Sequence, residues 1–125
     1  MSAARRPLLL IATTEDAERL RGGLTVACAE AALGGSVRLF LQLDAVAVLR
    51  PPLFAPRDGA HAAMGLPTLA ALLDDALDLG VAVIACQSGL ALAGMTAEAL
   101  DPRIEMSGPV GVLASSDAEE RTVLV

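Results

Sequence analysis

The fold is indicated most directly by one stretch of the chain, Val81-Ala82-Val83-Ile84-Ala85-Cys86-Gln87-Ser88-Gly89. Its first five residues are apolar and either small or β-branched, as in a buried strand of a parallel sheet. Two polar residues and a glycine follow the cysteine, and Leu90 begins a helical pattern. Cys86 therefore lies where a strand ends and a helix begins. The free N–H groups and partial positive charge of a helix start favour a thiolate, which makes Cys86 the candidate reactive group.

Apolar strands and amphipathic helices alternate on both sides of this stretch. Strands are predicted at 7–12, 36–42, 81–85 and 121–125, and a connector or short strand at 101–106. Helices are predicted at 17–33 and 69–79, from 90 to 94 and from 107 to about 117, with helical turns at 44–49 and 96–100. This order predicts a single α/β domain over residues 1–125, with three layers (α/β/α) around a mainly parallel sheet of about five strands.

Composition excludes several classes of function. The net charge of −6 and the absence of Trp and Tyr argue against binding to nucleic acid, which needs a basic surface and stacking platforms. All nine basic residues are arginines, so the chain has no lysine for a Schiff base or a phosphate loop. No metal-ligand spacing and no dinucleotide fingerprint is present, and no cofactor is expected.

The expected location is the cytoplasm. Two cysteines do not form a disulfide framework, and no secretory pattern precedes the first strand. The uncharged run 79–97 approaches the length of a membrane span, but glycines and polar residues interrupt it. A strand, a turn and a helix explain those residues better, so no membrane contact is expected.

Parallel strands end at the same edge of a sheet, and ligands gather at that edge. Residues at or just after the ends of the predicted strands are therefore the possible neighbours of Cys86 in a site: Thr13, Thr14, Gln42, Asp44, Gln87, Ser88 and Gly89. Cys28, in the middle of a helix, is interpreted as a small buried hydrophobic residue. His61 is interpreted as a solvated residue of a long loop. The whole segment 51–67 is a candidate either for part of a subunit contact or for a lid beside Cys86.

The segment Ala85-Cys86-Gln87-Ser88-Gly89-Leu90-Ala91-Leu92-Ala93-Gly94-Met95 resembles the part of DsrE/DsrF-like proteins in which a cysteine ends a strand and a glycine follows eight positions later. The opening of the chain is similar too: an apolar strand leads into Thr13-Thr14-Glu15-Asp16 and an alanine-rich helix ends at Gly34-Gly35. So is the close, where Gly108 leads into a helix and a final strand. The resemblance covers nearly the whole chain.

This resemblance implies a compact α/β domain that assembles into homotrimers or homohexamers. It implies that Cys86 accepts sulfane sulfur as a persulfide and passes it on, with sulfur-donor and sulfur-acceptor proteins as partners. Some members are labelled peroxiredoxin-like, but a thiol peroxidase that resolves itself needs a second cysteine, and Cys28 is badly placed. A carrier needs only one exposed thiolate.

A second interpretation stays open. The chain could be a non-catalytic oligomeric domain that binds a small ligand or nucleotide at the strand ends, with Cys86 inert. Whether the chain is an enzyme, as a sulfurtransferase, depends on which interpretation holds.

Overall fold

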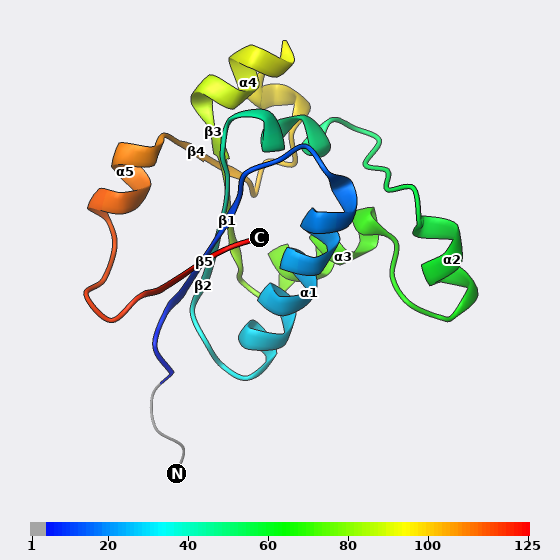
Figure 1. Cartoon of the computed structure of the whole chain (residues 1–125), viewed down its shortest axis with the longest axis horizontal. Helices are drawn as coiled ribbons and strands as arrows, with labels where there is room; N and C mark the ends of the chain where they lie inside the picture. Colours follow the sequence, from blue (N-terminus) through cyan, green and yellow to red (C-terminus); the bar gives the residue numbers. More distant parts are fainter. Residues whose placement is uncertain (1–4) are drawn as a thin grey trace.

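The computed structural model describes residues 5–125, and its centre is a five-stranded sheet in which all strands run parallel (Figure 1). The order across the sheet is β4-β3-β2-β1-β5. The strands are β1 (Leu8–Ala12), β2 (Val37–Leu41), β3 (Ala82–Cys86), β4 (Glu105–Ser107) and β5 (Arg121–Leu124). The predicted α/β fold with a parallel sheet of about five strands is confirmed.

Two helices, α1 (Ala17–Ala32) and α3 (Leu69–Asp78), cover one face of the sheet. The carboxylate of Asp16 caps α1 by accepting hydrogen bonds from the first-turn N–H groups, and the hydroxyl of Thr68 caps α3 in the same way. The buried apolar side chains of both helices are leucines and alanines, and they pack against the strands in one hydrophobic core. Each fully buried leucine contributes about 1.5–3 kcal/mol.

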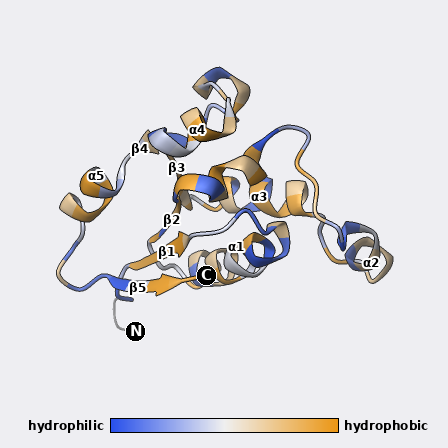
Figure 2. Cartoon of the chain, turned by 45° about the horizontal axis from the view of Figure 1, so that its top comes forward, coloured by the Kyte–Doolittle hydropathy of each residue, from blue (hydrophilic) through white to orange (hydrophobic). Residues whose placement is uncertain are grey.

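The opposite face of the sheet is covered more thinly. Within the described residues, its one helix is α5 (Pro109–Ala114), which has a single fully buried side chain, that of Val112. Figure 2 shows that α5 and β5 consist largely of hydrophobic residues. Several of them are exposed: Val110, Leu113 and Leu124 are 83%, 58% and 67% exposed. The two outer layers are therefore unequal, and the sheet is more accessible from the α5 side.

The carboxyl edge of the sheet carries two further elements. The 3₁₀ helix η1 (Leu43–Leu49) follows β2, and α4 (Gln87–Ala93) follows β3 directly. These two elements pack against each other above the strand ends (Figure 1). Gly94, which ends α4, has φ 64°, a left-handed conformation that glycine adopts without strain. A short turn, η2 (Ala97–Ala99), then leads to β4.

The structure departs from the sequence prediction in one missed helix and at several element boundaries. Helix α4 begins at Gln87 instead of Leu90, Ser107 belongs to β4, and α5 ends at Ala114 instead of near Asp117. Residues 51–67, predicted as a loop, contain the helix α2 (Asp58–Ala63), which is too short to show a helical period in the sequence. Strand β3 includes Cys86, because Cys86 pairs with Ser107 of β4. The uncharged run 79–97 is divided mainly between β3 and α4, and none of the helices within residues 5–125 has the length and apolarity that a bilayer crossing requires.

Candidate functional site

The ends of β1, β2 and β3 bring the predicted site residues to one edge of the sheet. Gln42 is half-buried and Gly89 is buried, whereas the other predicted neighbours are exposed: Thr13, Thr14, Asp44, Gln87 and Ser88. The Thr14 hydroxyl accepts a hydrogen bond from the N–H of Asp16 (3.4 Å), a local contact that stabilises the turn before α1. In residues 5–125, no hydrogen bond links these side chains to the Cys86 thiol. They therefore share an edge without forming one assembled site.

Cys86 occupies the predicted junction, as the last residue of β3 and the N-cap of α4. Its side chain is only 1% exposed, so the structure does not present the openly accessible thiolate that a carrier was expected to need. Its sulfur also makes no capping hydrogen bond to the first turn of α4. This burial depends on a contact that is distant in sequence. Ser107 of β4 pairs with Cys86, so β4 lies outside β3 and the end of β3 is not at the edge of the sheet.

The turn after Cys86 is fixed by a close approach between α4 and η1. A Cβ atom added to Gly89 would overlap the carbonyl oxygen of Leu43 and lie 2.5 Å from Cγ2 of Val46. Leu43 itself has φ 49°, a left-handed conformation that a residue with a side chain rarely adopts. Gly89 is therefore required by packing, which is a structural reason for the glycine three residues after the cysteine.

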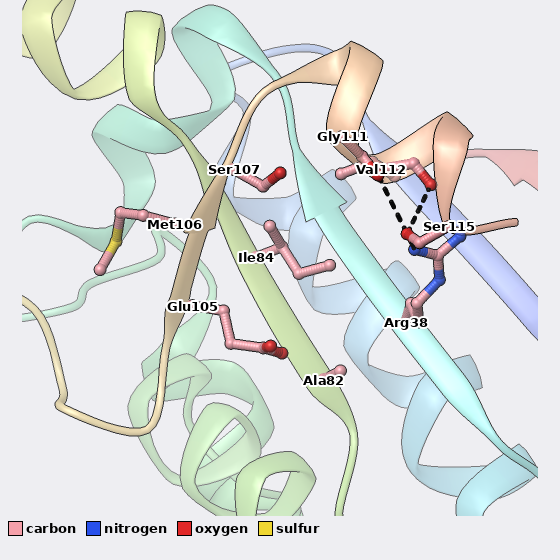
Figure 3. Close-up of a pocket in the computed structure, with 9 residues that line it drawn as sticks. All are labelled: Arg38, Ala82, Ile84, Glu105, Met106, Ser107, Gly111, Val112 and Ser115. Atoms are coloured by element: carbon pink, nitrogen blue, oxygen red, sulfur yellow. Dashed lines mark hydrogen bonds between the residues drawn. The ribbon is translucent and has the colours of Figure 1, made fainter.

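A cavity of about 380 Å³ lies on the α5 side of the sheet (Figure 3). Ala82 and Ile84 form its floor, and side chains alternate along a strand, so Cys86 points to the same face two residues beyond Ile84. Cys86 does not line the cavity, but its strand partner Ser107 does. The cavity therefore ends beside the buried thiol.

Sequence analysis did not identify the polar residues around this cavity. They come from β2, which is remote in the chain, and from the consecutive elements β4 and α5: Arg38, Glu105, Ser107 and Ser115. The alternation of Glu105 and Ser107 in a short strand was the one available signal. This alternation does not identify a cavity by itself, because the sequence does not reveal which face of the sheet α5 covers.

Cys28 lies on α1, against α3 on the other face of the sheet. Its sulfur is 3.9 Å from the carbonyl oxygen of Leu72, and the side chain is partly buried. Burial and then the charge of Asp75 raise the pKa of the Cys28 thiol, which disfavours a thiolate there. Both cysteines are free thiols, as predicted from the sequence. The position of Cys28 fits a structural role.

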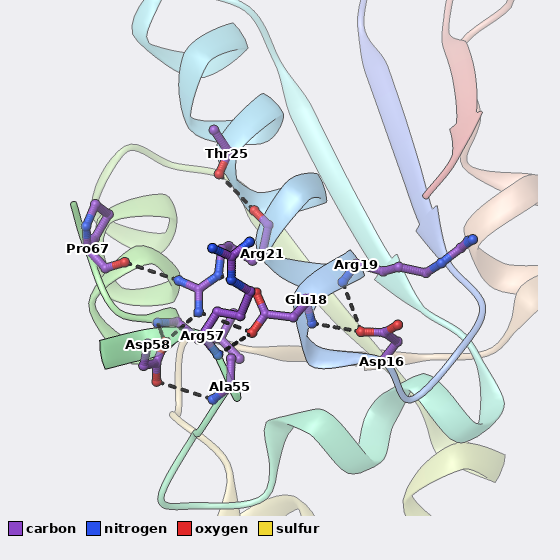
Figure 4. A network of polar contacts seen from close by, with 10 residues as sticks. Asp16, Glu18, Arg19, Arg21, Thr25, Ala55, Arg57, Asp58 and Pro67 are labelled. Atoms are coloured by element: carbon purple, nitrogen blue, oxygen red, sulfur yellow. Dashed lines mark hydrogen bonds and ion pairs between the residues drawn. The ribbon is translucent and has the colours of Figure 1, made fainter. Parts of the chain in front are cut away.

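The segment 51–67 is held to the helical face by a cluster around Arg21 (Figure 4). Arg21 is 5% exposed, and its guanidinium donates hydrogen bonds to Glu18 (2.8 Å) and Asp58 (2.6 Å) and to the carbonyl oxygen of Pro67 (3.2 Å). Asp58 also accepts from the N–H of Leu69 (2.9 Å), so the same carboxylate joins α2, α1 and the start of α3.

This anchoring puts α2 beside α1 and α3, away from α4 (Figures 1 and 2). The interpretation of residues 51–67 as a lid beside Cys86 is therefore wrong. His61 lines a separate cavity of about 180 Å³ with Arg21 and Thr25, and it does not reach the carboxyl edge. Within residues 5–125, no group of three or more His, Cys, Asp or Glu side chains is arranged to hold a metal ion.

Comparison with known proteins agrees with the fold. A sequence model of the DsrE/DsrF-like family matches residues 8–123. The structure is similar to that of a protein of unknown function from Methanobacterium thermoautotrophicum, with a TM-score of 0.67 and 18% sequence identity, over 97% of this chain and 100% of that one. At this identity the likeness concerns the fold alone. No protein with a curated description is significantly similar in sequence.

Proposed function

Because this chain belongs to the DsrE/DsrF-like family, we propose that it is a sulfur carrier whose Cys86 holds sulfane sulfur as a persulfide. The family is generally associated with sulfur relay. The observation that supports Cys86 as the carrier is its place at the end of β3, on the sheet face that contains the cavity. Cys28 faces the helical side and its thiol pKa is raised. The carrier would work with sulfur-donor and sulfur-acceptor proteins in the cytoplasm, where free cysteines persist.

The proposed transfer is an exchange between sulfur atoms. The Cys86 thiolate attacks the terminal sulfur of a donor persulfide, an S–S bond forms to Cys86, and the donor's S–S bond breaks to release the donor as a thiolate. An acceptor thiolate then attacks the terminal sulfur on Cys86 in the same way, and Cys86 leaves as a thiolate. Electrons balance in both steps, so neither an oxidant nor a reductant is required.

Burial of the thiol means that exchange needs a local opening of the chain. The α5 side is the thinner layer, because one six-residue helix covers it. Local openings occur most readily where few apolar contacts hold an element. We propose that the opening exposes Cys86 on the α5 side. A closed resting state would also protect a stored persulfide from other thiols.

Intact-mass measurement tests the proposal directly. After incubation with glutathione persulfide, the native wild-type protein is expected to gain one sulfur atom, about 32 Da. Cys28→Ser serves as the matched control: it should still load, although a hydroxyl in an apolar site should lower stability by about 1–2 kcal/mol. Cys86→Ser should gain nothing, because it lacks the attacking thiolate. An unloaded native wild type, or equal loading of Cys86→Ser, would exclude Cys86 as the carrier.

We also propose a homotrimer or homohexamer. This is supported by apolar side chains that remain exposed in a single chain, on segment 51–67, on α5 and on β5: Phe54, Met64, Leu66, Val110, Leu113 and Leu124. Closed symmetry would bury such surface at subunit contacts. Light scattering with refractive-index detection should give three or six times the 12.7 kDa chain mass, since without Trp or Tyr the chain absorbs weakly at 280 nm. A mass near 12.7 kDa at micromolar concentration would contradict this expectation.

A further inference from the structure

We propose that the cavity under α5 binds a small thiol, or its persulfide, that carries a protonated amine, and that this molecule exchanges sulfur with Cys86. The sulfur exchange rests on the function proposed above, whereas the binding of the amine does not. The inference follows from the shape of the cavity, its charge and its position relative to Cys86.

The shape suits a small ligand with an aliphatic part. The floor of Ala82 and Ile84 is apolar, and Val112 of α5 lines the same cavity (Figure 3). Near Ser107, α5 approaches closely, since a Cβ atom added to Gly111 would lie 2.5 Å from the Ser107 hydroxyl oxygen. A volume of about 380 Å³ holds a small molecule and excludes a folded protein segment.

The charge of the cavity favours a cation. Arg38 is already satisfied: its guanidinium donates to Glu120 (2.9 and 2.6 Å) and to the hydroxyl groups of Ser115 (2.9 Å) and Ser116 (3.4 Å). Arg38 and then the Ser116 hydroxyl lower the pKa of Glu120, so this pair is ionised and close to neutral overall. Glu105, on the other side, is exposed, and within residues 5–125 its carboxylate takes part in no hydrogen bond or ion pair. One uncompensated negative charge remains, and it would attract an ammonium group.

The position relative to Cys86 limits the length of the ligand. Ser107 is the strand partner of Cys86, and Glu105 lies two residues before Ser107 on the same face of β4. With about 4.8 Å between strands and about 3.3 Å per residue, the Cα atoms of Glu105 and Cys86 are roughly 8 Å apart. This spacing is compatible with a ligand in which two or three carbon atoms separate an ammonium group at Glu105 from a sulfur atom near Cys86.

The first experiment measures sulfur release from protein loaded with one sulfur atom at Cys86. Cysteamine and 2-mercaptoethanol differ only in an ammonium or a hydroxyl group, and the same loaded protein unfolded in urea corrects for their intrinsic reactivity. After this correction, native protein should prefer cysteamine by about 2- to 5-fold, the range expected for one exposed ion pair. The preference should vanish in Glu105→Gln and persist in Glu98→Gln, an exposed control on η2. Equal corrected rates in native wild type would overturn the proposal.

The second experiment does not depend on sulfur chemistry. 2-(Methylthio)ethylamine has the same amine but no thiol, and its addition should shift the amide NMR signals of Ile84 and Ser107. Glu105→Gln and the alcohol 2-(methylthio)ethanol should both remove these shifts. Amide shifts in a protein that cannot be loaded with a persulfide would support the amine site and exclude the sulfur-carrier function. Loading without shifts and without a preference for cysteamine would exclude the amine site alone.

Discussion

Replacement of Gly89 by alanine is expected to lower the free energy of unfolding by about 1–3 kcal/mol, as for a side chain forced into a packed site. The new methyl group would overlap the Leu43 carbonyl oxygen and lie 2.5 Å from Cγ2 of Val46. The carbonyl oxygen of Leu43 cannot move aside easily, because it is a backbone atom and Leu43 already has a φ of 49°. The first turn of α4 or η1 must shift, and both lie against the end of β3.

Gly22→Ala is the matched control for this prediction. Gly22 lies within α1, and an added Cβ would meet no atom within 4 Å. Alanine at an exposed helical position stabilises by about 0.5–1 kcal/mol relative to glycine. Urea unfolding followed by circular dichroism should therefore move the midpoint in opposite directions for the two variants. Equal stability of Gly89→Ala and wild type would show that η1 does not pack against α4 as described.

Replacement of Arg21 by methionine is expected to lower the Tm by several degrees at pH 7. Methionine fills a similar volume, but it leaves the carboxylates of Glu18 and Asp58 close together without their buried cation. The segment 51–67 would lose its hydrogen bond from Arg21 to the Pro67 carbonyl oxygen as well. Arg19→Met, at an exposed position of the same helix, should leave the Tm almost unchanged.

The Tm difference between wild type and Arg21→Met should shrink as the pH falls from 7 to 3. Arg21 and then the Arg57 N–H lower the pKa of Glu18, and the Leu69 N–H and then Arg21 lower that of Asp58. In wild type, these carboxylates stabilise the fold above their unfolded pKa values of about 4, and this contribution is lost as the pH falls through the lowered folded values. In the variant, protonation removes a repulsion instead. A difference that stays constant over this range would contradict the ionic role of Arg21.

The sequence predicted most elements because their signals are local. Short, mainly apolar runs predicted the central strands, and α1 was correctly placed between Asp16, which caps it, and Gly34, which has φ 87°. The cysteine at the junction of β3 and α4 was also placed correctly. Helix α2 was missed because its six residues are positioned by Asp58 contacts with α1 and α3, which are remote in sequence.

The accessibility of the candidate site could not be predicted in the same way. The burial of Cys86 depends on its pairing with Ser107, twenty-one positions later, and on the side of the sheet that α5 covers. The role suggested for Glu105 has the same origin, because an isolated acidic residue in a short strand has no local signature. The sequence near Cys86 therefore predicts where the cysteine lies along its strand. The solvent exposure of Cys86 and the charges around it depend on how the layers of the fold pack together.

The strand order also bears on how the chain folds. Strands β1 to β4 are neighbours in the order in which they occur in the sequence, so each pairing closes a moderate loop, whereas β5 returns across the sheet to pair with β1. The entropy of closing a loop grows with its length, so β5 should dock late in folding and detach early in native-state fluctuations. Helix α5 belongs to this same return connection. Amide hydrogen exchange that is slow in β1–β4 and faster in both α5 and β5 would show that α5 and β5 open together as one cooperative unit. The docking of this unit, the last step of folding, would then also be the step that covers Cys86.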